Sequence, residues 1–152
     1  MADRVSASIV IGGTVRAVQF ARLLELIALY DLRIDWDGDV FTPDQLPTGD
    51  ALRLCAYEVA WGNFEELEQY CCNEQIVYQR WSGACSGSFG AERIVYNGKT
   101  GPLNFAVDDD DNVVVYAQAI DQLGSMRAIR RYIAQAEIVI PPFAIAPDSS
   151  PS

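Results

Sequence analysis

The sequence predicts a single α+β domain in which helices cover one face of an antiparallel or mixed sheet. Three observations lead to this prediction: a length of 152 residues, a hydrophobic share of 50%, and segments of two-residue periodicity that alternate with segments of helical periodicity. A chain of this length can bury about two-thirds of the surface that its unfolded form exposes, so its stability does not require disulfides or a structural metal. We place the domain at residues 1–146 and expect a flexible tail at 147–152.

Residues 51–97 carry the clearest structural signals. The side chains of Leu52, Leu54 and Ala56 alternate with those of their neighbours, which is the period of a pleated strand. The predicted strands of this stretch are 52–59, 76–81 and 92–96. A loop rich in glycine and serine, residues 83–90, connects the last two of them.

A helix is predicted between the first two of these strands. Phe64, Leu67 and Cys71 form its apolar stripe, and Asn63 stands where a side chain can cap the first backbone N–H groups. Glu66 follows Asn63 at the spacing of a capping box. The core residues that we predict for this strand-helix-strand unit are Leu54, Phe64, Leu67, Cys71 and Ile76.

The segment before this unit adds an inner strand at residues 5–11 and a helix. Two glycines follow the strand, and Thr14 is expected to cap the helix that comes after them. Further on, the dipeptide Asp37-Gly38 suits a tight hairpin turn, because both central residues of such a turn adopt positive φ. We therefore expect a short hairpin at this point.

The segment after the unit adds a second hairpin and a last helix. Residues 103–107 are expected to pair with 112–116 across the acidic tip 108–111, and the helix lies within 119–137, where Ser125 caps or interrupts it. Up to residue 96, the order of the elements resembles the ferredoxin-like architecture. This resemblance implies a ferredoxin-like or split βαβ arrangement with an extra C-terminal hairpin and helix, and it implies no activity.

The charge balance restricts the classes of partner. The chain has 21 acidic and 11 basic residues, which gives a formal net charge of −10. Such a surface repels phosphate groups, so we expect no direct binding to nucleic acid or to an anionic membrane. We expect a protein partner, either a basic protein or a second copy of the chain. All bases but Lys99 are arginine, a bias that suggests a bacterial or mobile-element origin.

The four cysteines, Cys55, Cys71, Cys72 and Cys85, predict reduced thiols in the cytoplasm. The N-terminal apolar run is too short for a secretory signal, and no stretch of about 18 apolar residues could span a bilayer. Cys71 and Cys72 are adjacent on a predicted helix, where their side chains point about 100° apart and a bond would be strained. The cysteines also lack the paired spacing of zinc sites, so we expect no metal or other cofactor.

The chain contains no histidine, which excludes a Ser-His-Asp triad, a Cys-His dyad and a histidine metal site. This absence favours a protein without catalytic activity. One alternative is a small enzyme or anionic-ligand binder centred on Cys85 in the glycine-serine loop. There, backbone N–H groups could hold an anion, and Arg80 or Arg93 could lower the pKa of the thiol.

Two charge patterns have simple structural explanations. Asp35, Asp37 and Asp39 alternate like the start of a calcium loop, but the glycine and the final glutamate of such a loop are missing, so a hairpin turn is the better interpretation. The last predicted helix carries a basic stripe on one side, which we interpret as a solvated face. Its members are Arg127, Arg130 and Arg131.

Our leading hypothesis is a non-catalytic acidic intracellular binding protein that acts through protein–protein contacts. If the helices cover one face of the sheet, the other face should collect aromatic and arginine side chains, which are enriched at interfaces. We expect this surface to centre on Arg80, Trp81 and Arg93, and packing beneath the second hairpin is the competing explanation. A further alternative is an acidic inhibitor that mimics a nucleic acid and blocks a basic protein. The candidate binding residues are Arg53, Tyr57, Tyr78, Arg80, Trp81, Cys85, Arg93 and Tyr96.

Overall fold

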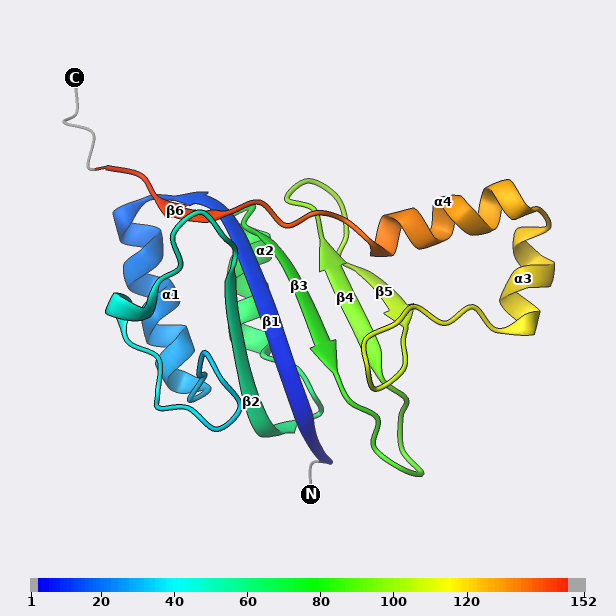
Figure 1. Ribbon diagram of the computed structural model, residues 1–152, viewed down its shortest axis with the longest axis horizontal. Coiled ribbons are helices and arrows are strands. Elements are labelled where there is room, and N and C mark those ends of the chain that lie inside the picture. The colour runs from blue at the N-terminus through cyan, green and yellow to red at the C-terminus, as the bar shows by residue number, and fades with distance from the viewer. Residues whose placement is uncertain (1–2, 148–152) are drawn as a thin grey trace.

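The computed structural model describes residues 3–147, which form an α+β domain around a six-stranded sheet (Figure 1). The strand order is β2-β1-β3-β4-β5 with every neighbouring pair antiparallel, and β6 pairs with the end of β1 in parallel. The strands are β1 (Arg4–Val15), β2 (Leu52–Ala60), β3 (Val77–Ser82), β4 (Glu92–Tyr96), β5 (Leu103–Ala106) and β6 (Phe143–Ile145). The helices are α1 (Ala17–Leu29), the short 3-10 turn η1 (Pro43–Gln45), α2 (Glu65–Asn73), α3 (Ala117–Leu123) and α4 (Met126–Ala136).

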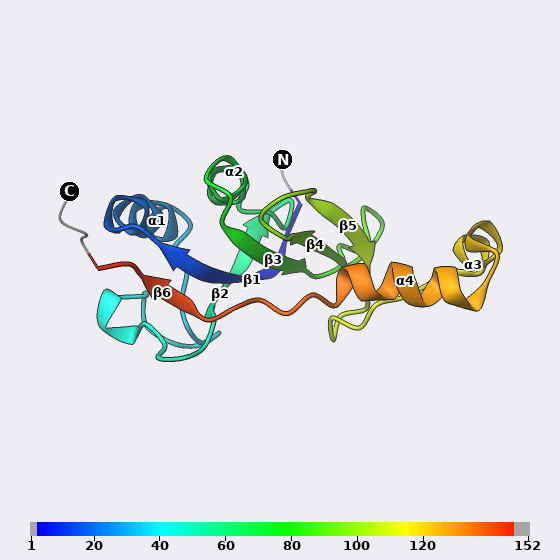
Figure 2. The same cartoon turned by 90° about the horizontal axis from the view of Figure 1, so that it is seen from above.

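Helices α1 and α2 lie on the same face of the sheet (Figure 2). The central strand β1 turns Val5, Ala7, Ile9 and Ile11 toward them, and all four side chains are buried. The predicted core residues are confirmed, since each of them is buried in the same cluster. They are Leu54, Phe64, Leu67, Cys71 and Ile76. One layer of helices thus leaves the opposite face of the sheet uncovered by α1 and α2.

A split βαβ unit is present in β2, α2 and β3. Both strands pair antiparallel with β1, which lies between them, so they run parallel to each other. The ferredoxin-like order differs from this fold, because it needs two consecutive strands between its helices. Only β2 lies between α1 and α2, and the expected hairpin around Asp37-Gly38 is reduced to isolated bridges. The backbone of Arg33 pairs there with Cys55 of β2 at 2.8 and 3.0 Å, which closes that edge of the sheet.

The predicted caps at Thr14 and Asn63 are wrong. Strand β1 continues through Thr14 because β6 pairs with its last residues, so α1 starts later, with Arg16 at its N-cap. Helix α2 starts at Glu65 with Phe64 at its N-cap, and the carboxylate of Glu68 accepts the backbone N–H of Phe64 at 2.7 Å. Asn63 and Glu66 therefore do not form a capping box.

The last predicted helix is two helices. Gly124 has φ 80° at the end of α3, and the Oγ of Ser125 accepts the N–H of Ala128 at 3.1 Å, so Ser125 caps α4 as expected. The predicted second strand of the hairpin, 112–116, is not formed, and the segment contributes one isolated bridge, between Val107 and Val113. Helices α3 and α4, residues 117–136, extend beyond the β5 edge, and we call them the arm (Figures 1 and 2).

The arm is attached at its base by a second apolar cluster. Val95 and Phe105 of the sheet pack there with Ala136 and Tyr132 of α4. The chain then returns across β1, where the N–H of Gly13 donates to Pro142 O at 3.1 Å and β6 begins. Apart from Pro147, the expected tail at 147–152 lies outside the described residues. Within residues 3–147, none of the helices has the length and apolar character that a bilayer crossing requires.

Candidate functional site

The predicted binding residues do not form one surface, because the pleat of the sheet divides them. Tyr78 and Arg80 of β3 point toward the helices, whereas Trp81 points to the opposite face. Tyr96 shares the helix side with its partner Tyr78, and their ring centroids are 5.9 Å apart. Both tyrosines are buried, so they belong to the core and not to a binding surface.

Arg80 is an internal ion-pair residue and not part of a binding surface. It is 3% exposed, and its Nε lies 3.1 Å from both carboxylate oxygens of Glu68 on α2. Its Nη1 donates to Ser82 Oγ at 3.0 Å and to Glu92 Oε1 at 3.1 Å. The guanidinium is thus compensated by two carboxylates inside the domain, which satisfies its charge without a partner.

Arg93 is also structural, although it points to the side opposite Arg80. It is 4% exposed and binds Asp111 Oδ1 at 2.9 Å, with a further ion pair to Glu137 at 3.5 Å. Its Nη1 donates to the carbonyl of Ala136 at 2.7 Å. Arg93 therefore joins β4 to the acidic tip and to the end of α4, with little of its side chain at the surface.

Cys85 lies in the loop between β3 and β4 and is half-buried. Its backbone N–H donates to Phe89 O at 2.8 Å, so this amide is not free to hold an anion. The arginines that were expected to support the Cys85 thiol are engaged by Glu68 and Glu92 and by Asp111 and Glu137. The structure does not bring Arg80, Arg93 and Cys85 together in one site.

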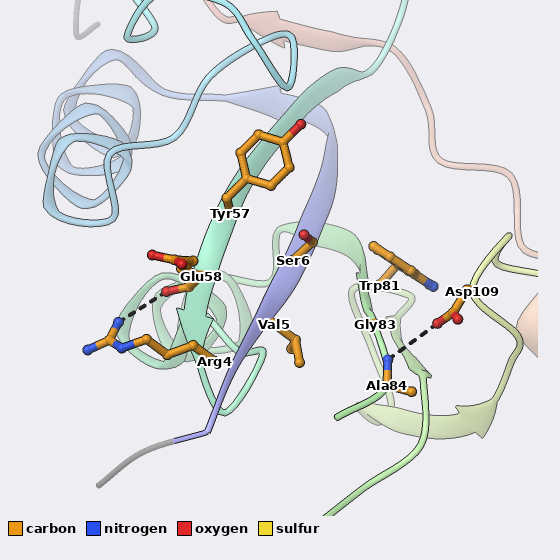
Figure 3. Close-up of a pocket in the computed structure, with 9 residues that line it drawn as sticks. All are labelled: Arg4, Val5, Ser6, Tyr57, Glu58, Trp81, Gly83, Ala84 and Asp109. Atoms are coloured by element: carbon orange, nitrogen blue, oxygen red, sulfur yellow. Dashed lines mark hydrogen bonds between the residues drawn. The ribbon is translucent and has the colours of Figure 1, made fainter. Parts of the chain in front are cut away.

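Arg53, Tyr57 and Trp81 are the predicted residues that stay accessible on the side away from α1 and α2. Together with neighbouring side chains of β1, β2 and β3 they form a surface that we call the open face. Its accessible or half-buried residues are Ser6, Ser8, Val10, Arg53, Tyr57, Gln79 and Trp81, and Cys55 on the same side is buried. At one end of the open face lies a pocket of about 390 Å³, lined among others by Tyr57, Glu58, Trp81 and Asp109 (Figure 3).

An aromatic pair stands beside the open face. Tyr57 contacts Trp36 from the loop after α1, with ring centroids 5.1 Å apart and planes tilted by 44°. Both rings are more than one-third exposed. Sequence reasoning missed Trp36, and the available signal was a tryptophan within the run of alternating aspartates, where a solvated turn has no need for a large apolar ring.

Two acidic loops flank these aromatic residues. The first, residues 35–39, places Asp37 next to Tyr57, and desolvation together with this carboxylate raises the pKa of Tyr57. In the second loop, residues 108–111, the carbonyl oxygen of Asp108 accepts the indole N–H of Trp81 at 3.3 Å. Asp109 Oδ1 accepts the backbone N–H of Ala84 at 3.4 Å (Figure 3). The open face therefore presents two aromatic rings, Tyr57 and Trp81, together with Arg53, between two acidic loops.

The arrangement offers no preformed metal centre in the part of the chain that is described, since no three Cys, Asp or Glu side chains gather there as ligands. Comparison of the chain with models of known protein families, with curated proteins and with solved structures gave no match.

Proposed function

We propose that this protein is a binding module whose open face holds a basic segment of a protein partner. The observation that carries the proposal is the position of Tyr57 and Trp81 between the acidic loops 35–39 and 108–111, with Trp36 of the first loop packed on Tyr57. The proposal keeps the hypothesis of a non-catalytic protein that the sequence favoured. It moves the binding site from Arg80 and Arg93 to the aromatic residues. The four cysteines are free thiols, which is compatible with a cytoplasmic setting.

This chemistry suits arginine and lysine side chains. A guanidinium or ammonium group over an aromatic ring is attracted by the negative face of the ring, and the contact is worth about 0.5–2 kcal/mol. Carboxylates at the rim add charge-assisted hydrogen bonds and attract a basic partner during its approach. Aromatic side chains in the centre and charges at the border are the usual distribution of binding energy in protein interfaces.

The proposal is tested by titrating the protein with a nona-arginine peptide in a calorimeter. Trp81→Ala and Tyr57→Ala are expected to weaken binding about five- to thirtyfold, which corresponds to the loss of one or two cation–π contacts. The matched control is Trp61→Ala, because Trp61 is 53% exposed and does not line the pocket. Equal affinity of the Trp81 variant, the Tyr57 variant and the wild type would contradict the proposal.

A second pair of variants separates this function from mimicry of a nucleic acid. A mimic binds through carboxylates alone, so it should be sensitive to Asp37→Asn/Asp109→Asn and insensitive to Trp81→Ala. The proposed module should respond to both changes. The double variant Glu65→Gln/Glu66→Gln removes the same charge from α2, on the other side of the sheet, and should leave the affinity within about twofold.

A further inference from the structure

The arm exposes large apolar side chains, as surfaces that bind another protein do. Tyr116, just before α3, is 64% exposed, and Met126, at the far end of α4, is 63% exposed. Helix α4 is strongly amphipathic, with Ile129, Ile133 and Ala136 on one side and the three arginines on the other. Only the inner end of α4 lies in the apolar cluster with the sheet, so the outer end presents both its apolar and its basic residues to solvent.

The charge of the arm is opposite to that of the rest of the chain. Residues 117–136 contain three arginines and one aspartate, while the other residues contain eight bases and twenty acids. Arg127, Arg130 and Arg131 are exposed, and none of them forms a salt bridge with another residue in the range 3–147. The arm therefore has unpaired positive charge, whereas the aspartates at 35, 37, 39 and 108–110 on the borders of the open face form no salt bridge with another residue in the range 3–147, and Asp111 pairs with Arg93.

Helix α4 is attached on the same side of the sheet as the open face. Val95 and Phe105, which support the base of the arm, point to the same side of the sheet as Trp81. The inner end of helix α4 thus already packs on this side of β4 and β5 in its own chain. The arm runs outward from there, and it cannot fold back onto its own Trp81 without leaving the cluster at its base (Figure 2).

We propose that the arm of a second copy of this chain occupies the open face. The outer end of α4 then lies over Tyr57 and Trp81, with Arg127 and Arg130 against the acidic loops, and a two-fold axis makes the exchange reciprocal. This inference rests on the proposed function, because it names the basic segment that the open face holds. The result is a homodimer joined by two identical arm-to-face contacts.

The test reverses charges on the arm or on the open face of the full chain and measures dimer formation by sedimentation velocity. The wild type is expected to sediment as a dimer of the 16.8 kDa chain. The arm variant Arg127→Glu/Arg130→Glu and the face variant Asp109→Arg/Asp110→Arg are each expected to weaken the dimer at least about tenfold. An equimolar mixture of the two variants should recover the dimer, because each arm then meets a face of opposite charge. Both variants remain net acidic, so their overall charges do not cause the recovery.

The matched control is Glu65→Arg/Glu66→Arg, which reverses two charges on α2 and should leave the dimer unchanged. Circular dichroism of each variant checks that the exposed substitutions preserve the fold. A wild-type monomer at all concentrations would overturn the dimer, and so would two variants that fail to complement each other. Neither result affects the nona-arginine titration, so a monomer that still binds the peptide through Trp81 would remove this inference and keep the proposed function.

Discussion

Glu68 on α2 and Arg80 on β3 face each other across the inside of the domain, with Arg80 Nε equidistant, at 3.1 Å, from the two carboxylate oxygens of Glu68. The same carboxylate accepts the N–H of Phe64 at the start of α2. One ion pair therefore fixes both the packing of α2 against the sheet and the first turn of the helix.

The first prediction concerns this ion pair. Arg80→Met should lower the free energy of unfolding by about 3–5 kcal/mol, because it leaves Glu68 buried without its cation. The double variant Glu68→Met/Arg80→Met should recover part of the loss, since the buried carboxylate of Glu68 is then removed together with its cation and only the part-exposed Glu92 loses a partner. Urea unfolding of the three proteins measures the effect, and an Arg80→Met protein as stable as the wild type would show that the pair contributes nothing.

The second prediction concerns the apolar contact between α2 and the sheet. Leu67 is fully buried, so Leu67→Ala should create a cavity and cost about 2–5 kcal/mol of unfolding free energy. Leu29→Ala is the control, since Leu29 is a leucine on α1 that is mostly exposed, and it should change the stability by less than about 1 kcal/mol. Similar midpoints in urea for the two variants would contradict the placement of Leu67 in the core.

The third prediction concerns the thiols. All four cysteines should be found reduced by mass spectrometry after alkylation under non-reducing conditions. Burial raises the pKa of Cys71 strongly and removes it from solvent, so iodoacetamide should label it much more slowly than the half-buried Cys85 at pH 8. Both should react at similar rates once the protein is unfolded in urea. Rapid labelling of Cys71 in the native protein would contradict its position.

The fourth prediction concerns the acidic loop 108–111. Hydrogen bonds from the backbone N–H and the side chain of Asn112 lower the pKa of Asp108. Desolvation raises the pKa of Asp111, and its bond with Arg93 offsets this only in part. Carboxyl NMR titration should therefore give Asp108 a pKa below 3.8 and Asp111 a pKa above it.

The two carboxyls consequently have opposite effects on stability. The lowered pKa of Asp108 contributes stability above its unfolded value that is lost as the pH falls through the folded value. The raised pKa of Asp111 contributes stability at low pH that is lost as the pH rises through the folded value. Titration of both groups on the same side of 3.8 would show that Asn112 and the burial near Arg93 do not control them.

Sequence patterns predicted the parts of the fold that depend on local alternation. Strand β4 was predicted with its bounds, and the apolar positions of α2 were correct, because burial on one face leaves a period that short windows reveal. The caps at Thr14 and Asn63 failed because other contacts decide where these helices start: β6 extends β1 past Thr14, and Glu68 accepts the N–H of Phe64, which becomes the N-cap of α2. Likewise, the Asp37-Gly38 hairpin is reduced to one bridge between Arg33 and Val40, and Arg33 also pairs with Cys55 of β2.

The candidate site was predicted only in part. Arg80, Trp81 and Arg93 lie on neighbouring strands, but the two-residue period of a strand places Arg80 and Trp81 on opposite faces of the sheet. Both arginines are also buried in ion pairs with acidic residues from other segments. Tyr57 and Trp81 do lie on the open face. Their combination with Trp36 depends on the path of the loop after α1, which a single sequence does not specify.

Because β6 closes against β1, the first strand of the fold has its final neighbour near the other end of the described chain. Gly13 pairs with Phe143, whereas β2 and β3 come from the middle of the sequence. During synthesis the central strand must therefore wait with open edges until β2, then β3 and finally β6 leave the ribosome. Contacts of such long separation slow folding, and strand edges that stay unpaired during this time can pair with other chains.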